Sequence, residues 1–189
     1  KEKKNDKGKT MPGALFVNLY GENNLSTVLN GKPLIVSQKT GYPFDGRVEL
    51  VVNAVGKKSL ETINLRIPEW CTKATVTVNG EAQQVDIKPN TYVELNRLWK
   101  KGDVIVLDMD MRARLIESHP LVEESRNQVA IKRGPIVYCL EQQDVDANID
   151  NVVIPADIKL VPVEIVIDGS KMIALEGTAK LIDDTSWKN

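Results

Sequence analysis

Few side chains in this sequence have the type and spacing that catalysis requires. His119 is the only histidine, and no serine or cysteine motif surrounds it. A lone histidine titrates near neutral pH, but without a nucleophile beside it we expect an exposed residue in a linker. Cys71 and Cys139 lack metal-ligand spacing, and His119 does not complete a site with them. A disulfide between the two is weakly supported, so we expect free thiols that act as small core hydrophobes.

Carboxylates are the remaining candidates for acid–base chemistry. A pair of them hydrolyses a glycosidic bond when their separation is right, but sequence gives no separation. The candidates lie in polar, turn-rich surroundings, where we expect a solvated surface: Glu123, Glu124, Glu141, Asp144 and Asp146. The run from Asp144 to Asp150 also offers oxygen ligands for calcium. It has Ile149 where an EF-hand loop needs glycine, so we predict no metal site there.

Aromatic residues are the usual means by which a β-sandwich binds a sugar, and this chain has three Trp, four Tyr and two Phe. Trp70 and Trp99 each stand at the end of a strand-like run and next to a turn. Amphipathic aromatics at such positions more often cover the end of a core than hold a ligand. Sugar contact at Trp70 and Trp99 therefore stays the alternative, and no catalytic or cofactor-binding residue is assigned.

Short strands must position these side chains, because apolar and polar residues alternate through most of the chain. In Thr62-Ile-Asn-Leu-Arg-Ile67 the apolar residues share one face and the polar residues the other. The dipeptide Asn79-Gly80 follows another such run and is a strong signal for a β-hairpin. Helix is scarce, with single turns expected at 69–73 and 96–101. Regular short strands separated by turns predict an all-β fold, an antiparallel β-sandwich of jelly-roll type. The runs are 34–40, 47–53, 62–67, 74–78, 92–95 and 104–107.

A polar interruption at 119–127 predicts a domain boundary. We expect a disordered basic tail at 1–13, the sandwich at 14–118 and a smaller second β lobe at 119–189, whose completeness the sequence leaves open. In the second lobe Gly134 and Pro135 break or kink a strand between two apolar runs. Further strands are expected at 163–167 and 172–175. Such a short lobe is marginal for an independent core.

The overall charge and hydropathy exclude several functional classes. A formal net charge of −1 gives no electrostatic reason to expect a nucleic acid or a membrane surface as partner. No apolar run approaches the ~20 residues that span a bilayer, and the polar N-terminus is not a signal peptide. The residues do not determine the compartment; a periplasmic or secreted location is expected over a cytoplasmic one.

Several segments in a fixed order resemble one family, glycoside hydrolase family 127, whose members are β-L-arabinofuranosidase-like enzymes. The resemblance is to the C-terminal β-sandwich portion of these enzymes, covering residues 14–145 well and the remainder loosely. The segments that carry it are Leu-Phe-Val-Asn-Leu-Tyr (15–20), Tyr-Pro-Phe-Asp-Gly (42–46), Leu-Arg-Ile-Pro-Glu-Trp-Cys (65–71), Val-Asn-Gly (78–80), Trp-Lys-Lys-Gly-Asp (99–103) and Lys-Arg-Gly-Pro-Ile-Val-Tyr-Cys-Leu-Glu (132–141).

The resemblance implies that the family's catalytic machinery lies in an (α/α)6 barrel that precedes this region. It implies a zinc-bound cysteine nucleophile, further cysteine and glutamate ligands, and a glutamate acid–base, all in that barrel. The paired cysteines expected just before Leu15 are absent from residues 1–13, and the family's Tyr- and Trp-rich strands are absent after Trp187. Cys71 and Cys139 match sandwich motifs, so neither receives a zinc role. We expect no cofactor in this chain.

Three functions follow as hypotheses. The first is an accessory, non-catalytic sandwich that supports the barrel, whether the barrel belongs to the same parent chain or to another chain. The second is a carbohydrate-binding module for a glycan of plant type, which would need exposed coplanar aromatic rings. The third is a free-standing interaction protein derived from the same sandwich. Without a barrel, an apolar patch would remain on one face, and self-association would follow.

Overall fold

The chain folds into two compact units, which a computed structural model describes over residues 13–56 and 60–182. The units divide between Met111 and Arg112. This division precedes the boundary expected at 118/119, because strand β10 (Ala113–Glu117) pairs with β11 (Val129–Arg133) of the second unit. Of the tail expected at 1–13, all but Gly13 lies outside the described residues, as does Trp187.

The larger sheet of the first unit has six strands, all antiparallel to their neighbours. Three hairpins build most of it, and the last of them along the chain turns at Asn79-Gly80 as predicted, with both residues at positive φ (54° and 82°). In spatial order the strands are β2 (Asn23–Leu29), β3 (Lys32–Thr40), β4 (Arg47–Val55), β9 (Val104–Met109), β6 (Ala74–Val78) and β7 (Glu81–Ala82).

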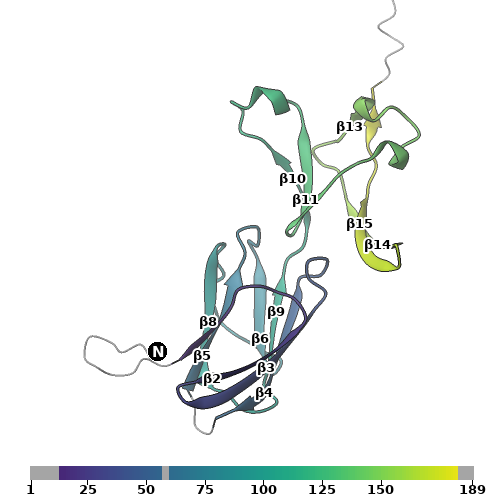
Figure 1. Cartoon of the computed structure of the whole chain (residues 1–189). Helices are drawn as coiled ribbons and strands as arrows, with labels where there is room; N and C mark the ends of the chain where they lie inside the picture. Colours follow the sequence, from purple (N-terminus) through teal and green to yellow (C-terminus); the bar gives the residue numbers. More distant parts are fainter. Residues whose placement is uncertain (1–12, 57–59, 183–189) are drawn as a thin grey trace, which may run out of the picture. The chain divides into compact units, whose positions relative to one another are not determined.

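The smaller sheet has three strands and faces the larger one (Figure 1). Its order is β1 (Ala14–Val17), β5 (Leu60–Ile67) and β8 (Thr91–Leu98). β5 and β8 are antiparallel, but β1 runs parallel to β5. Parallel neighbours need a long connection, and here strands β2 to β4 of the other sheet supply it. The sandwich is therefore antiparallel, as predicted, with one parallel pair at its edge.

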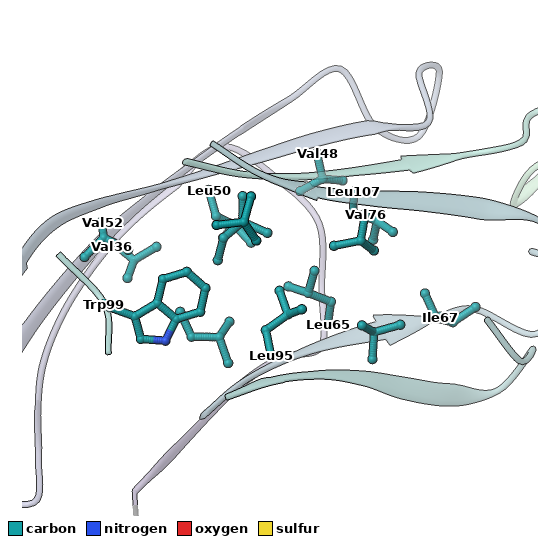
Figure 2. Close-up of a cluster of buried hydrophobic side chains, with 14 of the residues drawn as sticks. Val36, Val48, Leu50, Val52, Leu65, Ile67, Val76, Leu95, Trp99 and Leu107 are labelled. Atoms are coloured by element: carbon teal, nitrogen blue, oxygen red, sulfur yellow. The ribbon is translucent and has the colours of Figure 1, made fainter. Parts of the chain in front are cut away.

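The core fills the space between these two sheets, and the predicted alternation places it (Figure 2). Ile63, Leu65 and Ile67 of β5 are at most 1% exposed, because every second residue of the strand points inward. Val48 of β4 and Leu107 of β9, which are paired in the larger sheet, point into the same core from the other side (Figure 2). Each such side chain stabilises the fold by about 1.5–3 kcal/mol through burial. This core confirms the sandwich that the alternating sequence predicts.

A polar network closes the end of this core where β8 leads into β9. The buried carboxylate of Asp103 accepts hydrogen bonds from the Lys100 amide (2.8 Å) and from the side chain of Asn79 (3.0 Å). The Asn79 side chain in turn accepts a bond from the Val104 amide at 2.8 Å. Burial alone would raise the pKa of Asp103, but these hydrogen bonds and the cations Arg97 and Lys100 outweigh it, so the pKa is lowered.

Replacing this carboxylate should therefore destabilise the fold in a pH-dependent way. Asp103→Ala is expected to lower the free energy of unfolding by about 2 kcal/mol at pH 7, since it removes charge-assisted hydrogen bonds. Because the folded-state pKa lies below the usual 3.8, this stabilisation is present above that value and is lost as pH falls through the folded pKa. Urea denaturation of both proteins at pH 7 and below pH 3.8 measures the difference.

The exposed Asp108 provides the matched control for this experiment. It lies on the outward face of β9, and Asp108→Ala should change the stability by less than about 0.5 kcal/mol. A difference between wild type and Asp103→Ala that stays constant down to low pH would contradict the role given to the carboxylate.

The second unit has small sheets and little core. β10, β11 and β12 (Ile136–Tyr138) form an antiparallel sheet, in which Gly134 (φ 57°) and Pro135 make a tight turn rather than a kink within one strand. The remaining strands pair as β14 (Val161–Ile167) with β15 (Ser170–Glu176) and β13 (Val152–Val153) with β16 (Lys180–Leu181). Among this unit's described residues, no hydrophobic side chain is fully buried.

Helical structure in the described residues is limited to three short 3₁₀ turns, at Glu123–Ser125, Gln142–Asp144 and Ile149–Asn151. The turn predicted at 96–101 is wrong, because β8 continues to Leu98 and a tight turn follows. The segment 69–73 makes only a tight turn, with the Cys71 amide bonded to the Pro68 carbonyl at 3.0 Å. No helix among the described residues is long and apolar enough to cross a membrane.

Candidate functional site

Three aromatic residues from separate segments meet at one end of the sandwich. The Tyr20 and Tyr42 rings lie edge to face with centroids 5.8 Å apart, and Trp70 lies beyond Tyr42 at 6.5 Å with its ring nearly parallel. Tyr42 follows β3, and Trp70 follows β5 after Pro68. The Tyr20 hydroxyl donates a hydrogen bond to the Arg66 carbonyl, which ties the segment after β1 to β5. Strand ends therefore position all three rings.

The two phenols of this cluster are hydrogen-bonding groups rather than bases. Burial raises the pKa of Tyr20 far above its usual value, with only partial opposition from the nearby Arg66 cation. Burial also raises the pKa of Tyr42, against the weaker effect of a side-chain hydrogen bond with Trp70. Both hydroxyls are thus protonated across the physiological pH range. The cluster offers ring surface, its two hydroxyls are engaged with Arg66 and Trp70, and it lacks an acid–base pair.

An open polar recess of about 220 Å³ lies beside the loop that joins β3 to β4, the loop that also carries Tyr42. Much of its polar surface is already engaged within the protein. The Thr40 hydroxyl donates to the Arg47 carbonyl (2.6 Å), the Arg47 amide donates to Asp45 (2.9 Å), and the Arg47 guanidinium lies 3.3 Å from Glu49. We assign it no catalytic role, because its Thr40 hydroxyl and its Asp45 and Glu49 carboxylates are held in these contacts and its lining has no histidine. Its lining residues are Lys39, Thr40, Gly41, Asp45, Arg47 and Glu49.

The two tryptophans singled out from the sequence lie in different environments. Trp99 is 3% exposed; its indole N–H donates to the Glu61 carbonyl (2.9 Å), and the Arg97 guanidinium lies 5.3 Å from its ring. Sugar contact at Trp99 is inconsistent with this burial, because no ring face is left for a ligand. Trp70 is half-buried with one face against Tyr42, so sugar contact at Trp70 stays a prediction.

His119 is exposed, as predicted, but it does not lie in a linker. It belongs to the loop that joins the paired strands β10 and β11. Its Nδ1 accepts a hydrogen bond from the Leu121 amide at 3.3 Å, and its carbonyl accepts one from the Val122 amide at 2.9 Å. The residue therefore shapes a hairpin loop, and its Nδ1 is taken up by the backbone.

The candidate carboxylates are all exposed, as expected of a solvated surface. Glu141 and Asp144 cap a 3₁₀ turn, with Asp144 accepting a hydrogen bond from the Glu141 amide at 2.8 Å. Asn148 caps the next turn through the Asp150 amide at 3.1 Å. Side-chain oxygens of this segment thus accept backbone hydrogen bonds that cap two short turns. Over residues 13–56 and 60–182, no three His, Cys, Asp or Glu side chains cluster as metal ligands would.

The cysteines do not fit a zinc site. Both are thiols rather than halves of a disulfide, but only Cys71 is buried, while Cys139 is exposed. The expectation that both serve the core is therefore wrong for Cys139, which lies just beyond β12. The Cys71 thiol donates to the Lys73 carbonyl at 3.4 Å, and the two cysteines belong to different units. This donor set does not match the thiolate cluster that the family's zinc would need.

Two domain patterns match almost the whole chain. Residues 14–111 match the middle domain of the GH127 β-L-arabinofuranosidases, and residues 113–188 match the family's C-terminal domain. The chain belongs to glycoside hydrolase family 127. The family inferred from the ordered segments is thereby confirmed, and the junction of the two family 127 domains falls at the division between the compact units.

Individual family members are similar in sequence and in structure. A non-reducing end β-L-arabinofuranosidase of Bifidobacterium longum subsp. longum is 34% identical over 145 residues, which cover 74% of this chain and 20% of that protein. A solved glycoside hydrolase is 51% identical with a TM-score of 0.86, over 92% of this chain and 29% of its own. A GH127 β-L-arabinofuranosidase from Geobacillus stearothermophilus T6 is 36% identical with a TM-score of 0.85; the match covers 95% of this chain and 28% of that protein.

The chain thus spans about a fifth of the Bifidobacterium protein and less than a third of each of these structures. The middle and C-terminal domains of the family make up almost all of this chain, so these relatives contain much further polypeptide. The Tyr20–Tyr42–Trp70 cluster is the feature that sequence reasoning missed. Its signal was present, because all three residues fall within segments that carry the family resemblance, but sequence does not show that these segments meet.

Proposed function

We propose that this chain is the accessory, non-catalytic β-sandwich portion of a GH127 glycosidase and that it supports the catalytic barrel. The observation that carries the proposal is the match to the middle and C-terminal domains, without a match to the rest of the relatives' length. The nucleophile, the acid–base and the zinc ligands implied by the family are assigned to the barrel. The substrate of the whole protein would be a β-L-arabinofuranoside, as the names of its relatives state.

The second unit provides independent physical support. Its described strands bury no hydrophobic side chain fully, whereas Val137, Val161, Val166 and Leu181 are 58–65% exposed. A lobe of this size without a core has little stability of its own. Contact with further polypeptide would supply the missing burial, as expected for part of a larger enzyme.

Glycan binding by the sandwich itself is the weaker proposal, because the described aromatic rings do not form a platform. Trp99 is buried, and Tyr42 and Trp70 cover each other. Phe16 and Tyr92 are exposed, but their planes are perpendicular at 87°. Sugar stacking uses ring faces that are open together, and these pairs do not offer them.

A turnover assay tests the non-catalytic role. The purified 189-residue chain is incubated with zinc and an aryl β-L-arabinofuranoside, with the Geobacillus stearothermophilus enzyme as positive control. We expect no product above the protein-free background from this chain, because its described residues present no nucleophile beside an acid–base group. Turnover that a zinc chelator abolishes would refute the proposal.

A further inference from the structure

Large hydrophobic side chains gather on the outer face of the three-stranded sheet, the face that points away from the core. Phe16 of β1 is 54% exposed, Tyr92 of β8 is 43% exposed and Leu98 of β8 is 55% exposed. In the described part of the first unit, the other large hydrophobic residues with comparable exposure are Leu19, in the segment after β1, and Val28 of β2 in the larger sheet. The outer face of β1, β5 and β8 therefore carries three of these five exposed side chains, with Phe16 and Tyr92 together and Leu98 at the far end of β8. We call it the small-sheet face.

The register of the strands explains how this face is built. Phe16 is paired with Asn64 of β5, and Tyr92 is paired with Arg66 of the same strand. The two rings approach across the central strand with centroids 5.3 Å apart, and the Tyr92 hydroxyl donates to Asn18 at 2.8 Å. Asn64, which also points outward, is only 5% exposed. The rings are thus held in place on top of a covered, polar central strand.

The composition of the small-sheet face fits a protein partner. Aromatic residues at the centre of a surface, with polar residues around them, are typical of the residues that dominate protein interfaces. Here the exposed polar residue Asn18 bonds the Tyr92 hydroxyl, and the exposed Glu94 and Asn96 continue along β8 on the same face. The two rings touch each other edge to face, so together they present an uneven apolar surface that suits the side chains of another protein better than the flat face of a sugar.

The chain order of the family indicates which protein that is. The middle-domain match begins at residue 14, the first residue of β1, and β1 is an edge strand of the small sheet. The description of this domain as the middle one implies a preceding domain in the relatives, whose polypeptide reaches the middle domain at the start of β1. The preceding domain is thus tethered at an edge strand of the small sheet, which raises its effective concentration near the small-sheet face.

We propose that the small-sheet face is the docking surface for the domain that precedes the middle domain in GH127 enzymes, with Phe16 and Tyr92 as its central contacts. This rests on the proposed function, in which that domain is the catalytic barrel. The partner surface carries apolar side chains that cover the two rings, with hydrogen-bonding groups opposite Asn18, Glu94 and Asn96. The contact fixes the sandwich against the enzyme without contributing a catalytic group.

Footprinting in the whole protein tests the docking directly. The complete reading frame that contains these residues is expressed beside the 189-residue chain, and hydroxyl-radical oxidation is measured at individual side chains. We expect Phe16 and Tyr92 to react several times more slowly in the whole protein, while Val28, on the other sheet, reacts equally in both. Equal reactivity at Phe16 and Tyr92 overturns the proposal, and so does a reading frame that encodes no preceding domain.

Substitution of the two rings gives a second, independent measurement. Phe16→Ser combined with Tyr92→Ser should lower the melting temperature of the whole protein more than that of the 189-residue chain, because only the whole protein loses a contact between domains. Val28→Ser, at a site 64% exposed, is the control and should shift both proteins equally. An equal shift of both proteins by the double variant contradicts docking.

The other occupants of this face are outcomes of the same experiments. Protection of Phe16 and Tyr92 that rises with the concentration of the 189-residue chain alone would assign the face to a second copy. Protection by an arabinose oligosaccharide would assign it to a glycan; either result overturns the proposal. Turnover by the isolated chain would instead refute the accessory role, so the two proposals fail separately.

Discussion

Gly46→Ala should lower the stability of the sandwich by about 3 kcal/mol, the upper part of the usual range for overpacking a close-packed site. A Cβ at residue 46 would lie 2.1 Å from the Met109 carbonyl oxygen and 2.8 Å from Met111 Cγ. The Met111 side chain can move aside. The Met109 carbonyl is fixed, because the Met109 amide donates a hydrogen bond to the Gly46 carbonyl (3.0 Å) and Met109 pairs with Ala74 of β6.

The loss is measured by urea denaturation followed by circular dichroism, as a lower midpoint at unchanged slope. Gly21→Ala is the matched control, because a Cβ there meets no atom within 4 Å and its φ is not positive. That variant should be neutral or slightly stabilising, since alanine restricts the unfolded chain. If Gly46→Ala were as stable as Gly21→Ala, the close approach of β4 and β9 at this point would be wrong.

The alternating core is the part of the fold that sequence predicts well. Ile63, Leu65 and Ile67 are separated by polar residues, and strand geometry turns this spacing directly into one buried face. Asn79-Gly80 is equally local, because its positive φ angles depend on the two residues themselves. Such features follow from neighbouring residues, and neither requires knowledge of a distant partner.

Strand pairing is less predictable, because it depends on residues far apart. β10 resembles the strands before it in composition, and nothing within Ala113–Glu117 shows that its partner is β11 rather than a strand of the sandwich. The boundary was therefore expected too late. β2 is an edge strand with no fully buried side chain, so its polar sequence gives a weak signal. The parallel pairing of β1 likewise depends on a connection through another sheet.

The candidate site shows the same limit. Tyr20, Tyr42 and Trp70 are close in space only because two strand ends and a loop meet at one end of the sandwich. Trp70 and Trp99 have similar local sequences, a strand end followed by a turn. Trp70 is half-buried and Trp99 is 3% exposed, because only Trp99 belongs to the buried cluster between the two sheets. Residue type and spacing identified both tryptophans, and only packing separates them.

Trp99→Ala should produce the largest loss of stability among these variants, about 4 kcal/mol, the range for removing a buried aromatic ring. The ring lies in the same buried cluster as Val52 and Leu95 (Figure 2). Its N–H donates a hydrogen bond to the buried Glu61 carbonyl at 2.9 Å. The contact with the Arg97 guanidinium is lost as well. Equilibrium unfolding in urea, read by circular dichroism, measures the loss at 25 °C.

Neighbouring and conservative variants separate the causes of this loss. Leu98→Ala, one residue away at a position 55% exposed, should cost less than about 0.5 kcal/mol, because it opens no cavity. Trp99→Phe keeps most of the ring but removes the hydrogen bond from the indole N–H to the Glu61 carbonyl, so it should cost about 1–2 kcal/mol. This order follows only if Trp99 is a core residue. If Trp99→Ala instead kept full stability while weakening binding to an arabinose oligosaccharide, Trp99 would be a ligand contact, and the closed core at this end of the sandwich would be wrong.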